Sequence, residues 1–212
     1  MSPSPVEFLP GRHVGPGHAP LLIAGPCAIE GPQTVDYAHA IQEAIDGLAV
    51  QWVFKASFDK ANRTSVGGGR GVGLDNGVAI LRQIRDELKV PVLTDVHLPE
   101  QCSPVAEVCD VLQIPAFLCR QTDLLQAAGA TGKTVNIKKG QFLAPEGMAK
   151  AADKVRATGN EKVLLTERGT FFGYGRLVVD FSGFAAMREA APLIFDATHS
   201  VQQPGGLGDR TG

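Results

Sequence analysis

The sequence predicts an α/β fold, a TIM-type (β/α)8 barrel of which about seven strands are present in the chain. Short apolar runs alternate with stretches of helical periodicity, which is typical of parallel α/β folds. Some runs, such as Val163-Leu164-Leu165, are apolar throughout, as expected for strands that are covered on both faces. A polar or charged residue follows each run, and in a barrel all of these strand ends open onto one face.

The elements are predicted in strict alternation. The first strand covers Leu21 to Ala24, and a helix follows because Val35, Ala38, Ile41, Ile45 and Leu48 recur at helical spacing. The later strands are predicted at 52–55, 90–94, 111–114, 134–138, 163–166 and 193–196. The later helices are predicted at 75–88, 101–108, 122–128, 145–157 and 184–190, with a short extra strand at 177–180.

The chain is predicted to form one domain. Its 212 residues, 44% of them hydrophobic, are enough for a single core. Residues 1–20 are rich in Pro and Gly and are predicted as a flexible leader, and residues 21–212 as a barrel domain that is incomplete at the C-terminus. An open, doubly wound sheet would require a GxGxxG turn after the first strand, and Gly25-Pro26-Cys27-Ala28 lacks that spacing.

Composition excludes several classes of partner. A net charge of -2 gives no overall attraction to nucleic acid or to an anionic membrane. The absence of a signal-peptide pattern and of a membrane-length apolar run predicts a cytoplasmic protein. The four cysteines contain no CxxC pair, so we expect reduced thiols. Cys102, Cys109 and Cys119 are expected to be buried apolar residues, whereas Cys27 is expected at the mouth of the barrel.

The residues at the strand ends predict a site for an anionic substrate. These residues are Cys27, Lys55, Asp95, Gln113, Lys138, Arg168 and His199. The loop from Lys55 to Ser65 carries further cations, and Lys and Arg are the residues that bind phosphate and carboxylate groups. The Gly67 to Gly73 segment is expected to form a wall of this pocket.

Two further chemistries remain open at this point. A lysine at a strand end would act as a Schiff-base nucleophile if its pKa were depressed, although several cations together favour binding of a doubly charged substrate. Cys27 and His199 provide one sulfur and one nitrogen ligand, which suit a divalent ion such as Zn or Fe.

Several motifs together resemble the 3-deoxy-D-manno-octulosonate 8-phosphate synthase family. They are Ile23 to Glu30, Lys55 to Ser65, Thr94 to His97, Gln113 to Asp123, Val135 to Phe142, Glu167 to Gly169 and Asp196 to Gln202. The resemblance implies condensation of phosphoenolpyruvate with D-arabinose 5-phosphate and water, which gives 3-deoxy-D-manno-octulosonate 8-phosphate and phosphate for lipopolysaccharide synthesis. It also implies a homotetramer that acts on small molecules and binds neither nucleic acid nor membrane.

The resemblance implies roles for individual residues. Those that bind phosphoenolpyruvate would be Lys55, Lys60, Gln113, Ala116, Lys138 and Arg168. Those that bind the sugar phosphate would be Asn62, Arg63, Thr64 and Arg120, the last from a neighbouring subunit. Lys60, Asp95, Lys138 and His199 would serve catalysis.

Cysteine at position 27 is similar to the metal-dependent branch of the family, which implies Zn, Fe or Mn bound by Cys27 and His199. The two remaining ligands are expected beyond Gly212. Two alternatives stay open. One is the related heptulosonate synthase, which uses erythrose 4-phosphate, and the other is an inactive barrel fragment.

Overall fold

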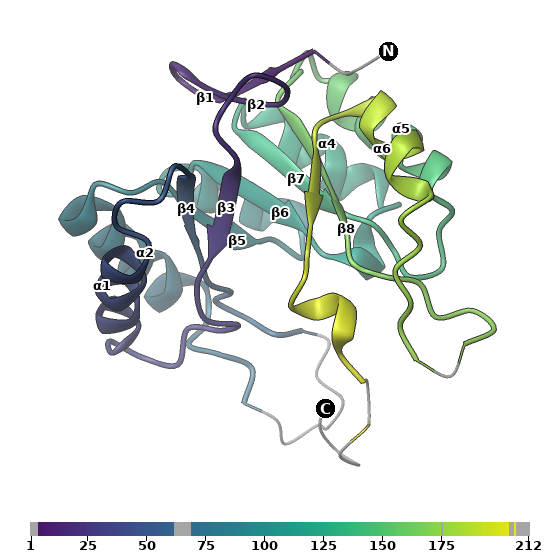
Figure 1. Cartoon of the computed structure of the whole chain (residues 1–212). Coiled ribbons are helices and arrows are strands. Elements are labelled where there is room, and N and C mark those ends of the chain that lie inside the picture. The colour runs from purple at the N-terminus through teal and green to yellow at the C-terminus, as the bar shows by residue number, and fades with distance from the viewer. Residues whose placement is uncertain (1–3, 62–68, 175, 204–205, 207–212) are drawn as a thin grey trace.

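The structure is a computed structural model that describes residues 4–61, 69–174, 176–203 and 206. Its main sheet has seven parallel strands, each hydrogen-bonded to the next one in sequence. The sheet curls into a nearly closed barrel with β3 and β9 at its two edges, which confirms the predicted fold class (Figure 1). The strands are β3 (Leu21–Ala24), β4 (Gln51–Lys55), β5 (Val92–Asp95), β6 (Val111–Ile114), β7 (Thr134–Lys138), β8 (Val163–Glu167) and β9 (Leu193–Phe195).

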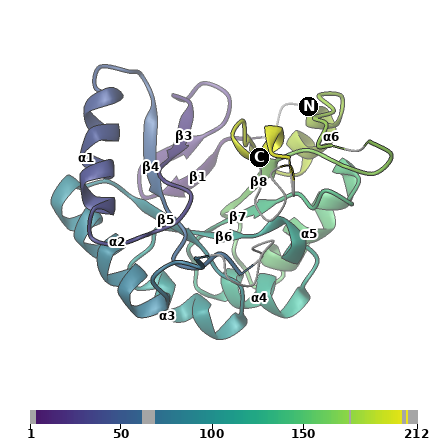
Figure 2. The same ribbon diagram turned by 90° about the horizontal axis from the view of Figure 1, so that it is seen from below.

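Helices cover the outer face of this sheet (Figure 2). They are α1 (Thr34–Ala44), α2 (Leu74–Leu88), α3 (Cys102–Ala106), α4 (Thr122–Ala130), α5 (Met148–Arg156) and α6 (Gly183–Ala190). Four short 3-10 helices also occur in the described residues: η1 (Pro99–Gln101), η2 (Ala116–Leu118), η3 (Pro145–Gly147) and η4 (His199–Val201). The predicted helical periodicity is confirmed, for example in α2, where Leu81 and Ile84 are fully buried against the sheet. None of the described helices is long and apolar enough to cross a membrane.

Alternation along the strands divides the side chains between the inside of the barrel and the helical layer. Val53, Leu93, Val111 and Leu164 lie inside and form one apolar cluster. Since successive side chains on a strand point to opposite faces, the residue two positions later on each strand also lies inside, nearer the C-terminal end. Those positions are Lys55, Asp95, Gln113 and Thr166. The interior is therefore apolar at its base and polar at its mouth.

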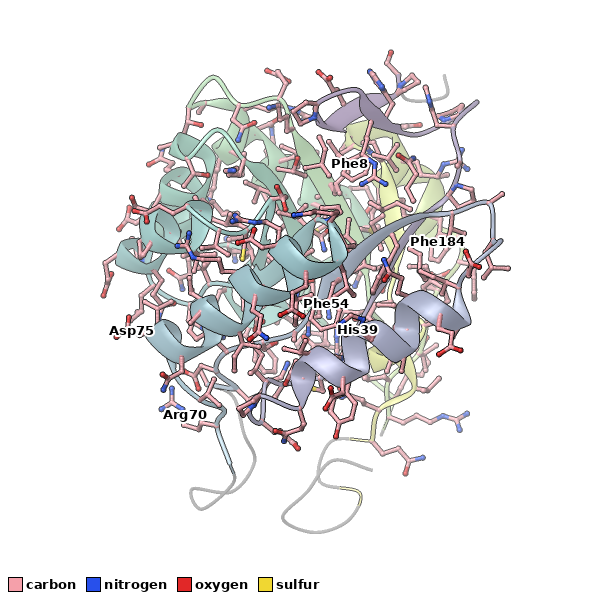
Figure 3. All side chains as sticks on the ribbon, turned by 90° about the vertical axis from the view of Figure 1, so that its left-hand side faces the viewer. Phe8, His39, Phe54, Arg70, Asp75 and Phe184 are labelled. Atoms are coloured by element: carbon pink, nitrogen blue, oxygen red, sulfur yellow. The ribbon has the colours of Figure 1, made fainter. Side chains whose placement is uncertain are left out.

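The base is closed by a hairpin that the sequence did not predict. β1 (Val6–Leu9) and β2 (Arg12–Val14) pair antiparallel within the segment predicted as a flexible leader. Phe8 is 1% exposed, packs with the inner apolar cluster, and accepts a hydrogen bond at its carbonyl from the Thr134 hydroxyl. Residues 6–14 of the predicted leader are thus structured, because their apolar side chains pack against the base of the barrel; Figure 3 labels Phe8 at this end of the molecule.

Smaller differences occur in the second half. The extra strand predicted at 177–180 is reduced to a single antiparallel bridge between Thr170 and Val178. α5 begins at Met148 because Pro145–Gly147 forms a 3-10 turn before it. The three cysteines predicted to be structural are buried, and burial raises the pKa of each thiol, to about 11 at Cys102 and about 12 at Cys109. Cys27 is exposed.

Candidate active site

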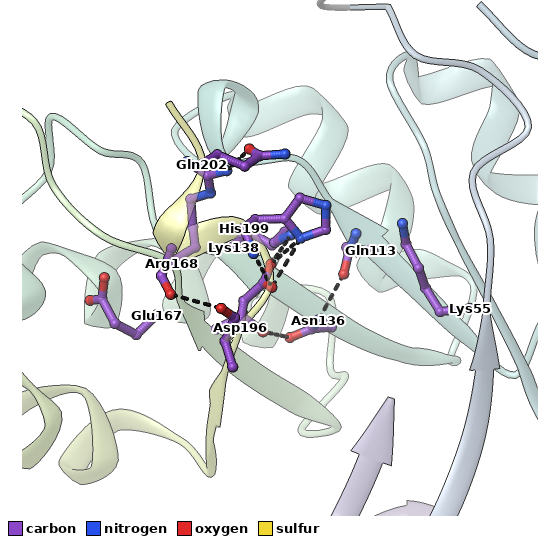
Figure 4. A network of polar contacts seen from close by, with 12 residues as sticks. Lys55, Gln113, Asn136, Lys138, Glu167, Arg168, Asp196, His199 and Gln202 are labelled. Atoms are coloured by element: carbon purple, nitrogen blue, oxygen red, sulfur yellow. Dashed lines mark hydrogen bonds and ion pairs between the residues drawn. The ribbon is translucent and has the colours of Figure 1, made fainter. Parts of the chain in front are cut away.

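The mouth of the barrel gathers charged side chains from neighbouring strands. Lys55, Asp95 and Gln113 lie at or near the ends of β4, β5 and β6, and each is less than a tenth exposed. Lys138 ends β7, and Arg168 directly follows β8 with 7% of its surface exposed. Figure 4 shows Lys55, Gln113, Lys138 and Arg168 arranged around the same opening. The structure thus brings together the cations predicted from the strand ends.

Two lysines converge on one serine beside β4. The Lys55 and Lys60 ammonium groups lie 3.1 Å and 2.7 Å from the Ser57 hydroxyl oxygen. Ser57 is held in place because its carbonyl accepts a hydrogen bond from the Ile29 N–H at 2.8 Å. Burial, together with the nearby Lys60 charge, lowers the pKa of Lys55 to about 8. In the described residues neither lysine forms an ion pair with a carboxylate, so both retain capacity for an anion.

Asp95 is a buried carboxylate that interacts electrostatically with Lys55 and Lys60. Its carboxylate lies 3.3 Å from the Nε2 atom of His97. Burial would raise the pKa of Asp95, but the hydrogen bond with His97 and the charges of Lys55 and Lys60 outweigh burial and hold the pKa well below its usual range. One Asp95 oxygen and the Nδ1 atom of His97 are buried without a hydrogen-bond partner in the described structure. Both atoms therefore keep unused hydrogen-bonding capacity in the described structure.

Asp196 links two predicted site residues and was itself not predicted as one. Its carboxylate forms an ion pair with Lys138 and lies 2.8 Å and 2.9 Å from the Nδ1 atom of His199. It also accepts a hydrogen bond from the His199 backbone N–H at 3.0 Å. Burial opposes ionisation of Asp196, but His199 and Lys138 outweigh it and hold its pKa far below the usual range. The Asp-x-x-His spacing, which allows this turn, was the available signal in the sequence.

Arg168 has an unused hydrogen-bonding capacity. Its Nη2 atom donates to the Gln202 side-chain oxygen at 2.9 Å, as Figure 4 shows. Its Nη1 atom is buried and has no partner in the described residues. A buried guanidinium donor without an acceptor is costly, so this position favours an anionic ligand that would satisfy it.

Hydrogen bonds between neutral side chains connect Gln113 to Asn136 and Asn136 to Thr166. The Asn136 amide donates to the Gln113 oxygen at 3.1 Å, and the Thr166 hydroxyl donates to the Asn136 oxygen at 2.7 Å. With its oxygen occupied, Gln113 has only its two N–H donors left for a ligand, and neither has an acceptor among the described residues. The sequence did not reveal this contact, because Asn136 and Thr166 lie within strands that read only as core.

Not every predicted residue joins this group. Asn62, Arg63 and Thr64 lie outside the described residues, as do Gly67 and Gly68 of the predicted pocket wall. Ala116 is buried at the start of η2. Arg120 is exposed after η2, and only its backbone carbonyl has a recorded hydrogen bond in the described structure, from Lys154.

Cys27 and His199 are adjacent at the mouth. A hydrogen bond from His199 is the main reason that the pKa of Cys27 falls to about 6, with the charges of Lys60 and Lys55 adding to it against the effect of burial. Asp196 engages the Nδ1 atom of His199, so Nε2 is the ring nitrogen that Asp196 does not engage. The pair provides two suitable donors for a divalent metal. Among the described residues no group of three or more His, Cys, Asp and Glu side chains could hold a metal.

Fold and site together define a barrel enzyme with a cation-lined mouth, the class that acts on small anionic substrates. A family model described as the DAHP synthetase I family matches residues 6–211, and the chain belongs to this family. The match includes the β1–β2 hairpin.

Individual proteins with similar sequences give a more specific comparison than the family model does. The chain is 56% identical over 202 residues to the 2-dehydro-3-deoxyphosphooctonate aldolase of Desulfatibacillum aliphaticivorans, covering 94% of this chain and 74% of that protein. It is 58% identical over 200 residues to the enzyme of the same name from a Synechococcus strain, covering 93% of this chain and 70% of that protein. A relative of the same name from Magnetococcus marinus is 58% identical over 198 residues, with 92% and 69% coverage. These similarities confirm the resemblance stated from the motifs.

Proposed function

We propose that the chain is a synthase that condenses phosphoenolpyruvate with D-arabinose 5-phosphate and water, giving 3-deoxy-D-manno-octulosonate 8-phosphate and phosphate for Kdo and lipopolysaccharide synthesis. The observation that carries the proposal is the set of cations at the barrel mouth that lack full partners among the described residues. Lys55 and Lys60 share a hydroxyl group, and one Arg168 nitrogen has no acceptor in the described structure. A ligand with both a carboxylate and a phosphate group would satisfy these donors.

In this proposal, the first substrate occupies the buried part of the mouth. Phosphoenolpyruvate contacts the cationic residues together with the free amide of Gln113 and the surface at Ala116; the cations are Lys55, Lys60, Lys138 and Arg168. D-Arabinose 5-phosphate would be bound by Asn62, Arg63 and Thr64, which lie outside the described residues, and by Arg120 contributed by a neighbouring subunit. Asp95 lies beside the reacting carbons.

The chemistry follows from the placement of charge. The cations neutralise the enol phosphate, so its C3 atom attacks the aldehyde carbon of the sugar and the new carbon–carbon bond forms. C2 then carries developing positive charge, water adds to it, and the phosphate group leaves. His199, oriented by Asp196, or a divalent metal would orient or deprotonate the water, and Lys138 stays electrostatic because Asp196 pairs with it. A divalent metal bound nearby would lower the pKa of that water.

A side-by-side acceptor assay tests this function. Purified protein would be supplied with phosphoenolpyruvate and either D-arabinose 5-phosphate or erythrose 4-phosphate, and products would be identified by mass spectrometry. We expect the eight-carbon product to dominate. A seven-carbon product as the main species would establish the heptulosonate alternative, and the absence of any condensation product would contradict the proposal.

We also propose a divalent metal, Zn, Fe or Mn, held in part by Cys27 and His199. Thiolate and imidazole are a suitable donor pair, and the Cys27 pKa of about 6 favours the thiolate at neutral pH. Chelation should abolish activity, and Cys27→Asn should lower metal affinity by at least about tenfold because an amide replaces a thiolate. Elemental analysis after dialysis measures occupancy directly. Cys119→Ala is the control, and equal occupancy in Cys27→Asn and the parent would contradict the assignment.

The affinity for phosphoenolpyruvate should fall as the pH rises above about 8, the pKa of Lys55. Lys55 attracts an anion only when protonated, and its pKa is lowered, so the charge is lost within an accessible pH range. At the steepest point the dissociation constant should rise about tenfold per pH unit. Calorimetry at a series of pH values measures this, and Lys55→Met should bind weakly with a shallower dependence. An unchanged constant up to pH about 9 would contradict the role of Lys55.

We propose a cytoplasmic homotetramer. The exposed Arg120, beside Phe117 with half of its surface exposed, supports a contact between copies at η2. Light scattering coupled to size exclusion measures the assembly, and a monomer at micromolar concentration would contradict it.

A further inference from the structure

A buried ion pair lies directly behind the proposed anion site. Lys139 follows Lys138 in sequence, but it points to the opposite side of the strand, toward the helical layer, in line with the core residues Val135 and Ile137. It is 1% exposed, which is exceptional for a lysine. Its partner Glu167, 2% exposed, has its carboxylate 3.6 Å from the Lys139 ammonium. Neither residue belongs to the site described above.

Lys139 ties together the loops that follow β7 and β8. Its ammonium group donates to the carbonyl oxygens of Gly140 and Leu143, both at 3.3 Å, and to the Thr170 hydroxyl at 3.0 Å. Gly140 and Leu143 belong to the loop after β7, and Thr170 belongs to the loop after β8. All three proton positions of this ammonium therefore have acceptors in addition to Glu167.

Glu167 fixes the turn in which Arg168 lies. Its second carboxylate oxygen accepts a hydrogen bond from the Gly169 N–H at 2.5 Å. Gly169 has φ +95°, a conformation that favours glycine. Figure 4 shows Glu167 directed away from Lys138 and His199. Arg168 therefore lies between Glu167 and Gly169, two residues that the Glu167 carboxylate ties together through this hydrogen bond.

We propose that Lys139 and Glu167 are positioning residues that set the direction of Lys138 and Arg168, the two cations they precede or follow. This inference rests on the proposed function of the site. Since neighbouring side chains on a strand point to opposite faces, anchoring Lys139 and Glu167 outside the barrel fixes Lys138 and Arg168 inside it. The ends of the two neighbouring strands β7 and β8 are also joined, because the Lys139 N–H donates to the Thr166 carbonyl at 2.7 Å.

Stabilisation of the fold does not by itself explain why Lys139 and Glu167 are buried as an ion pair. A buried ion pair is often no more stabilising than apolar residues of similar volume, because both charges lose their hydration. Burial lowers the pKa of Lys139, which shows this cost. Losing one partner, by contrast, leaves an uncompensated buried charge, so single variants would confuse positioning with instability.

The double variant Lys139→Met/Glu167→Gln separates the two effects. Methionine preserves the length of the side chain, glutamine can still accept from Gly169, and no buried charge is left alone. We expect it to unfold cooperatively near the parent's temperature. Its dissociation constant and KM for phosphoenolpyruvate should nevertheless rise about tenfold, since small misplacements of binding groups are costly. KM for D-arabinose 5-phosphate should change far less. Lys150→Met, which removes an exposed partner of Asp153 on α5, is the matched control.

The outcomes are distinct. A folded double variant with the parent's phosphoenolpyruvate affinity would overturn the inference while leaving the proposed function intact. If the parent itself does not bind phosphoenolpyruvate in calorimetry, the proposed function fails and the inference with it. If the double variant does not fold, the variant Thr170→Val tests the inference instead, because it removes only one hydrogen-bond acceptor of Lys139. A severalfold loss of affinity then supports the inference, and parental affinity overturns it.

Discussion

Replacement of Lys138 with methionine is expected to weaken phosphoenolpyruvate binding by about tenfold to a hundredfold. Losing one charge-assisted contact costs roughly 1.5–3 kcal/mol, which corresponds to that range. Methionine retains the length of the side chain and removes only the charge. The variant also leaves Asp196 without its lysine partner, so a carboxylate close to the incoming anion adds repulsion.

Calorimetry with phosphoenolpyruvate measures this change, and Lys150→Met controls for the loss of a lysine elsewhere. The double variant Lys138→Met/Asp196→Asn distinguishes lost attraction from added repulsion, because it removes both charges. We expect the double variant to recover part of the affinity and to remain weaker than the parent. Parental affinity in Lys138→Met would remove Lys138 from the binding site.

Replacement of Gly25 with alanine is expected to destabilise the barrel strongly, although it adds only one methyl group. A Cβ atom at Gly25 would lie 1.9 Å from the Lys55 carbonyl oxygen and 2.8 Å from its carbonyl carbon. Because both contacts are to backbone, the end of β3 would have to move away from β4. Such overpacking costs about 1–3 kcal/mol or more, and a protein of this size loses roughly 2–4 °C in melting temperature per kcal/mol.

Thermal unfolding followed by circular dichroism measures this effect. Lys150→Met is the control, since its side chain is 86% exposed and lies on α5, away from β3 and β4. Phosphoenolpyruvate affinity should also fall in Gly25→Ala, because the displaced backbone carries Lys55. A melting temperature within about 1 °C of the parent would show that the strands have more freedom than the structure indicates.

Much of the barrel could be predicted because its physical causes are local in sequence. Continuous apolar runs such as Val163-Leu164-Leu165 identify strands that are buried on both faces, and periodicity identifies the helices between them. The strand-end cations could also be predicted, since parallel topology alone brings Lys55, Lys138 and Arg168 to one face. The β1–β2 hairpin could not be predicted, because only its contact with the barrel base makes so short an element stable.

The side chains that contact the site residues could not be predicted from the sequence either. Asp196 was read as the end of a strand, yet its carboxylate holds residues from two different elements. Asn136 and Thr166 form a hydrogen bond across neighbouring strands, although 30 positions separate them in sequence. A sequence shows which residue types are present at a strand end, whereas the distance between side chains on different strands depends on how the sheet curls.

The position of Asp196 also affects which anions the mouth would retain. While the site is empty, this carboxylate already neutralises Lys138, so a small singly charged anion that displaces it merely exchanges one counter-ion for another. Such an anion therefore gains little binding free energy. A ligand long enough to reach the unsatisfied Arg168 nitrogen and the Lys55–Lys60 pair as well gains contacts that no protein group provides in the described structure. The internal carboxylate would thereby act as a filter, rejecting common cellular anions such as chloride and admitting those with two separated anionic groups.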